Sequence, residues 1–125
     1  MKYVILIYSN PESREIWGRL TVEQRTEGLK AYAALDADLD ASGERLFSEA
    51  LDDVSKAKRV AVTEGRTITT DGPFAEVKEH LAGFFLLDCE SLERAVEIAA
   101  RVPEAELGLV EVRPVLNLDE VAHRA

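Results

Sequence analysis

Two segments of the chain are apolar at odd and even positions alike. They cover residues 2–9 and residues 82–89, and both are short enough to be single strands. Successive side chains of a strand point to opposite faces, so such a strand is covered on both faces. The pattern therefore predicts that these two segments are the central strands of a sheet.

The next long segment has helical periodicity. Thr21 is suited to be an N-cap, with Gln24 three residues later as in a capping box. Gly43 stands where a left-handed residue would end the helix. We therefore expect a helix from Val22 to Ala41, with its apolar side chains at three- and four-residue spacing. That apolar stripe consists of Leu29, Tyr32, Leu35 and Leu39.

A second helix is predicted between Ser91, a candidate N-cap, and Val102. Pro103 follows and blocks further extension. Its apolar positions form the most regular helical stripe in the chain. They are Leu92, Ala95, Val96, Ala99 and Val102.

The remaining predicted strands complete a β-α-β-β-α-β order of elements. Residues 44–50 and 108–114 read as strands, and residues 58–63 and 67–70 as an inserted ribbon around a turn at Glu64-Gly65-Arg66. The result is an α+β, ferredoxin-like β-α-β-β-α-β sheet with both helices on one face. The uncovered face favours a second copy packed against it, so we expect a homodimer.

Domain organisation, composition and charge narrow the function classes. We expect one domain over residues 1–116 and a polar tail over residues 117–125. The 125 residues have a net charge of −9, which argues against binding nucleic acid or anionic membranes by bulk attraction. The apolar N-terminal run is too short for a membrane span or a secretory leader. With a single cysteine, Cys89, the chain is expected to be cytoplasmic.

Residues 71–79, reading DGPFAEVKE, concentrate the chemistry. Gly72 and Pro73 favour a defined bend that presents Asp71 at the end of one strand and Lys78 before the next. In a desolvated cleft Asp71 could be a general base and Lys78 an electrostatic clamp, with Phe74 against a ligand. The alternative is a structural turn with solvated charges.

Other candidates surround this segment. Tyr8, Glu79 and Arg113 are candidate ligand-binding residues, since Arg113 can hold a carboxylate through two hydrogen bonds. His80 is a weaker candidate for proton transfer. No known metal-ligand spacing, phosphate-binding glycine loop or nucleophile elbow is present, so neither a metal nor a cofactor is expected.

The same segment resembles the DGPFAETKE signature of the YCII-related proteins, specifically the DGPF subfamily, with Val77 in place of threonine. The likeness continues through residues 81–88 and closes with Glu111-Val112-Arg113-Pro114, similar to the family's EVRP ending. The resemblance implies a ferredoxin-like fold and a dimer of the dimeric α/β-barrel type. It also implies a possible sigma-factor partner, but no established reaction.

One departure from the wider family bears on mechanism. Related proteins carry a histidine on the first helix and an aspartate before the proline that follows the second helix. Here the helix from Val22 to Ala41 has no histidine, and Val102 precedes Pro103. The dehydrochlorinase-type mechanism of one branch is therefore not expected.

Three functions stay open from the sequence. The first is a dimeric small-molecule-binding protein with a cleft around the DGPF segment, or a regulatory accessory of a sigma factor. The second is an enzyme that uses Asp71 as the base on a small metabolite. In the third, the segment only folds a hairpin and seals the dimer.

Overall fold

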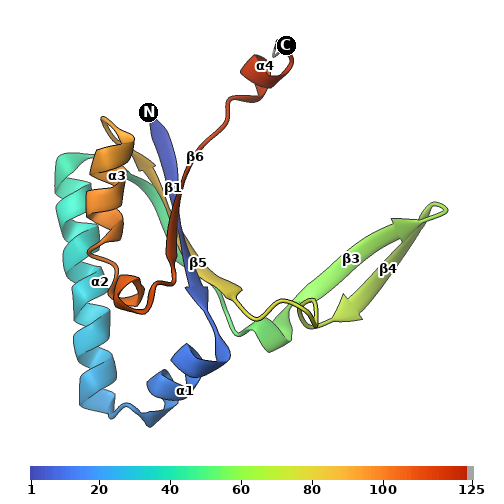
Figure 1. Ribbon diagram of the computed structural model, residues 1–125, viewed down its shortest axis with the longest axis horizontal. Helices are drawn as coiled ribbons and strands as arrows, with labels where there is room; N and C mark the ends of the chain where they lie inside the picture. The colour runs from blue at the N-terminus through green and yellow to red at the C-terminus, as the bar shows by residue number, and fades with distance from the viewer. Residues whose placement is uncertain (124–125) are drawn as a thin grey trace.

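The computed structural model describes residues 1–123 as one four-stranded sheet, a separate two-stranded ribbon and four helices (Figure 1). Two short 3-10 helices lie in the connections. In chain order the elements are β1 (Lys2–Ser9), α1 (Pro11–Arg19), α2 (Val22–Ser42), β2 (Arg45–Ala50), η1 (Val54–Lys56), β3 (Lys58–Thr63), β4 (Arg66–Asp71), β5 (His80–Asp88), α3 (Leu92–Ala99), η2 (Pro103–Leu107), β6 (Val110–Pro114) and α4 (Leu118–Val121).

The main sheet is antiparallel, and its strand order is β2-β5-β1-β6. The two doubly apolar segments therefore lie side by side at its centre, as their pattern predicted. The arrangement is a mixed α+β fold consistent with the ferredoxin-like class.

Helices α2 and α3 pack on one face of this sheet (Figure 1). The core between them and the sheet includes Ile5 and Leu87, which are wholly inaccessible to solvent, together with Leu35, Leu39 and Ile98. The opposite sheet face carries no helix, and we call it the open face.

The capping signals place the starts of both main helices and the end of α2 correctly, whereas α3 ends at Ala99 and not at the predicted Val102. The apolar stripes are only partly right. Thr21 and Gln24 form the predicted capping box, and Gly43 ends α2 with φ of 78°. Of the two predicted stripes, Leu29, Leu92 and Val96 are exposed. The buried residues of α3 are Ala95 and Ala99, as predicted, and Ile98, which the predicted stripe omitted. Val102, also in the predicted stripe, is buried just after the helix.

Helix α1 was not predicted from the sequence. It has no buried residue, so it leaves no apolar stripe to detect. Its signal is local: the Asn10 and Ser13 side chains form a capping box and Pro11 occupies the first turn.

The ribbon of β3 and β4, which we call the arm, projects away from the four-stranded sheet and its helices, which we call the body (Figure 1). Its two strands are joined by the turn predicted at Glu64-Gly65-Arg66, in which Glu64 and Gly65 both have positive φ. Within residues 1–123, no helix has the length and apolar character that crossing a membrane requires.

Candidate functional site

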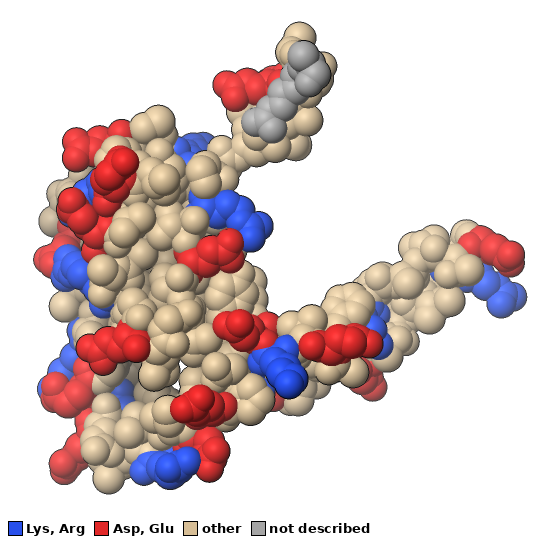
Figure 2. All heavy atoms as spheres, in the orientation of Figure 1, with Lys and Arg blue, Asp and Glu red and all other residues tan. Residues whose placement is uncertain are grey.

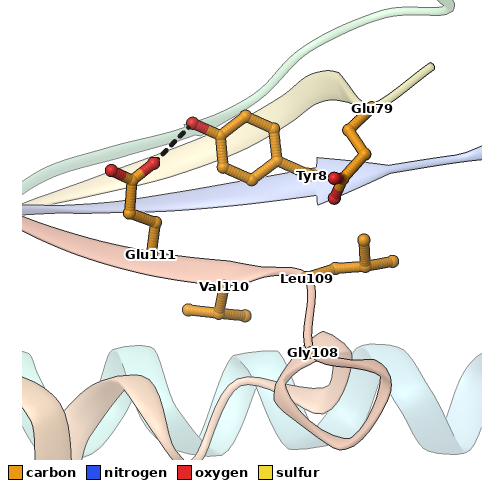
Figure 3. Close-up of a pocket in the computed structure, with 6 residues that line it drawn as sticks. All are labelled: Tyr8, Glu79, Gly108, Leu109, Val110 and Glu111. Atoms are coloured by element: carbon orange, nitrogen blue, oxygen red, sulfur yellow. Dashed lines mark hydrogen bonds between the residues drawn. The ribbon is translucent and has the colours of Figure 1, made fainter.

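A cavity of about 270 Å³ lies at one end of the main sheet, where β1 ends and β6 begins. The adjoining end of β5 contributes Glu79 from just before the strand. Figure 3 shows the Tyr8 ring between the carboxylates of Glu111 and Glu79, with the start of β6 beneath. The lining residues are Tyr8, Glu79, Gly108, Leu109, Val110 and Glu111.

At this end of the sheet, the side chains of Tyr8, Glu111 and Arg113 form a hydrogen-bonded network. The Tyr8 hydroxyl donates a 2.8 Å hydrogen bond to Glu111, and Arg113 donates to the other Glu111 oxygen at 2.7 Å. The Arg113 hydrogen bonds, followed by the one from Tyr8, lower the pKa of Glu111. Burial, followed by the hydrogen bond to Glu111, raises the pKa of Tyr8. At neutral pH the network therefore holds an anionic Glu111 and a neutral phenol.

Glu79 differs from Glu111 because it forms no ion pair with any residue in the described range 1–123. Its negative charge contributes to the raised pKa of the Tyr8 phenol. The cavity thus has one carboxylate that is paired with a cation, Glu111, and one that is not, Glu79. That electrostatic environment favours a group that donates hydrogen bonds or carries positive charge.

His80 lies beside the cavity, at the start of β5. Its Nδ1 is 3.2 Å from the Arg14 guanidinium, which also donates to the Ser9 hydroxyl. Since a guanidinium only donates, Nδ1 accepts and the neutral ring carries its hydrogen on Nε2. Nε2 is buried and has no partner among residues 1–123. The ring is held in place by α1, an element that the sequence analysis missed.

Apart from Glu79, the residues predicted from the DGPF segment lie outside this cavity, at the root of the arm and in the loop that follows it. Asp71 ends β4, where its side chain is 84% exposed and pairs with Lys58. The Phe74 ring lies 4.7 Å below the guanidinium of Arg59. Lys78 is exposed in the loop before β5. Of the predicted residues, the structure therefore places Tyr8 and Glu79 in the cavity lining. Arg113 reaches the cavity only through Glu111, and His80 contacts Arg14 beside it. Asp71, Phe74 and Lys78 are not among the lining residues.

Gly108, Leu109 and Val110 also line the cavity, although no sequence pattern marked them as candidate site residues. Gly108 ends η2 with φ of 71°, and this turn starts β6 beside Tyr8. The sequence signal that could have identified this turn is a glycine directly before an apolar strand. Within residues 1–123, no group of three or more His, Cys, Asp or Glu side chains is arranged to hold a metal ion.

Comparison with known proteins identifies a family and a relative. The family model of the YCII-related domain matches residues 1–119. An uncharacterized protein from Rhizobium meliloti (strain 1021) is 32% identical over 117 residues, which cover 92% of each chain.

Proposed function

The chain belongs to the YCII-related domain family, and from this premise we propose that it is a homodimeric protein that binds a small molecule. The observation that carries the proposal is the cavity beside Tyr8, with its fixed polar network and the uncompensated carboxylate of Glu79. Ligand sites commonly combine apolar walls with a few oriented polar groups. Leu109 and Val110 supply such walls here.

The cavity chemistry suggests a class of ligand. Its volume of about 270 Å³ lies just below the usual range for drug-sized ligands, so the ligand is small. Glu79 and the backbone around Gly108 would accept hydrogen bonds from it. We therefore favour a small amine or amino alcohol over an anionic metabolite.

The homodimer is supported by the open face of the main sheet. Strand alternation places apolar side chains there on both central strands, including Leu6 and Phe84, and none of these is fully buried in one chain. On the neighbouring β2, the Phe47 ring lies 6.0 Å from that of Phe84. A second copy is the simplest cover for such a face. It would also restrict access to the cavity, because Tyr8 and Glu111 lie on this face.

The finer family assignment is part of the same proposal. Residues 71–79 and the Glu111–Pro114 ending support placement in the DGPF subfamily, whose dimers are of the α/β-barrel type. A sigma-factor partner, a cytoplasmic location and a general-base role for Asp71 stay predictions.

A thermal-shift titration tests the ligand site. The probes are small primary amines and amino alcohols, with carboxylates of equal size for comparison. A ligand at 100 times its dissociation constant stabilises the folded state by about 2.7 kcal/mol. We expect stabilisation by a member of the amine set, and we expect Glu79→Gln to abolish it.

Asp71→Asn is the matched control, since it removes an exposed carboxylate outside the cavity lining. It should leave the stabilisation unchanged. Loss of the shift in Asp71→Asn with retention in Glu79→Gln would instead place the ligand at Asp71, outside the cavity. No stabilisation by any amine would contradict the proposed ligand class.

A further inference from the structure

Among the described residues 1–123, the arm has no strand of the main sheet beside it. Its strands β3 and β4 pair only with each other, and every residue of β4 is exposed. Isolated two-stranded ribbons are marginally stable in water. On β3, Val60 and Val62 point to the same face, and they are 67% and 69% exposed. Such a ribbon needs a surface to pack against.

We propose that the arm of each chain packs on the body of a second copy and clasps the dimer. The inference rests on the homodimer proposed above and adds the segment that secures it. Figures 1 and 2 show that the arm and the segment from the end of β6 to α4 project on the side of the open face, with a hollow between them. The body of a second copy placed in that hollow would contact the arm.

The solvent-accessible surface area of the chain is large enough to include an interface with a second copy. The chain exposes 8992 Å². A compact monomer of 13.8 kDa is expected to expose about 6,600 Å². The excess is about 2,400 Å² per chain, or about 4,800 Å² for a pair, which lies within the range of obligate homodimer interfaces.

Charge favours the body of another copy as the surface that the arm contacts. The arm carries Lys58, Arg59 and Arg66 against only Glu64 and Asp71. The whole chain has a net charge of −9, so the body is strongly acidic. A slightly basic arm on an acidic body is electrostatically complementary, whereas two bodies alone repel each other.

The DGPF segment fixes the direction of the arm at its root. The Gly72 N–H donates a 2.7 Å hydrogen bond to the Ala57 carbonyl across the base of the ribbon. Lys58 pairs with Asp71 at the same level. The guanidinium of Arg59 covers the Phe74 ring. An arm held in this way loses less conformational entropy when it binds a partner.

Sedimentation equilibrium of Val62→Asp tests the clasp. Val62 is exposed in the single chain, so the substitution leaves the core untouched. We expect the dimer dissociation constant to rise at least tenfold. Val22→Asp is the control, because Val22 is equally apolar and 78% exposed, but lies at the start of α2. Its dissociation constant should stay within twofold of the unmodified chain.

Photo-crosslinking identifies the contact directly. A benzoyl-phenylalanine replaces Thr67 on the arm, and isotopically light and heavy chains are mixed before irradiation. Crosslinks that join light to heavy peptides of the body support the clasp, whereas crosslinks confined within one chain overturn it.

The outcomes separate the clasp from the dimer. A dimeric unmodified chain with unchanged association in Val62→Asp overturns the clasp and leaves the proposed homodimer standing. A monomeric unmodified chain overturns both.

Discussion

At the scale of single residues, Tyr8, Glu111 and Arg113 determine the chemistry of the cavity. One carboxylate accepts from a phenol and from a guanidinium, so its charge is already compensated before any ligand arrives. Glu79, on the other side of the Tyr8 ring, has no such partners among residues 1–123. The residue free to meet a ligand is therefore Glu79, and Glu111 serves to orient Tyr8.

This division of roles predicts a ranking of pKa effects on Glu111. Arg113→Gln and Tyr8→Phe each remove a donor to its carboxylate, so both should raise its pKa. The rise should be larger for Arg113→Gln, because the guanidinium is the stronger of the two causes. Carboxyl-detected NMR titration measures it. An unchanged Glu111 pKa in Arg113→Gln would contradict the network.

A second ion pair predicts how stability depends on pH. Arg94 on α3 donates two 2.9 Å hydrogen bonds to Glu44, which lies between α2 and β2. They lower the pKa of Glu44 from 4.5 to about 2. The folded-state pKa is the lower one, so this stabilisation is fully present above pH 4.5 and is lost as the pH falls toward 2.

Glu44→Gln should reduce the free energy of unfolding near neutral pH by about 1.5–3 kcal/mol, and should flatten the acid dependence. Glu97→Gln is the matched control, because Glu97 contacts the same Arg94 from a more exposed position. It should change the free energy by less than about 1 kcal/mol. Urea denaturation at fixed protein concentration measures both. Equal losses in the two variants would contradict a special role for Glu44.

At the scale of elements, the sequence predicts what periodicity and capping encode. The doubly apolar strands, the Thr21 cap and the Gly43 stop are all local signals, and each was found where predicted. Helix α1 buries nothing and so has no apolar stripe to detect. The cavity depends on tertiary placement, since Tyr8 and Glu111 are 103 residues apart and meet only through the pairing of β1 and β6. The sequence therefore predicts candidate residues there but not which of them meet.

The root of the arm gives a prediction at this scale. Gly72 has φ of 81°, a conformation that a side chain disfavours by about 1–2 kcal/mol. No neighbouring atom would clash with an added methyl group. Gly72→Ala should therefore loosen the arm alone, with amide exchange across residues 58–71 about five to thirty times faster. Exchange in β1 and β5 should be unchanged.

Gly18→Ala serves as the comparison, because Gly18 has neither a positive φ nor a close neighbour. Hydrogen exchange in the arm should not change in that variant. Equal acceleration of exchange in the arm and the central strands of Gly72→Ala would show that the arm is not an independent unit.

At the scale of the whole molecule, the single chain leaves many apolar side chains exposed to solvent. Helices cover one sheet face, whereas the open face and the arm are on the other side (Figure 1). The cavity lies at one end of the sheet. The second copy that we propose would cover the apolar face and give the arm a surface to pack against. It would also narrow the entrance to the cavity beside Tyr8.

The most direct measurement is sedimentation equilibrium of the unmodified protein at micromolar concentration. Our account predicts a particle with twice the 13.8 kDa mass of the chain. It also predicts that the particle persists on dilution, as expected for an interface of this size. A mass of 13.8 kDa across the concentration range would contradict the account, since the open face and the arm would then remain exposed to solvent.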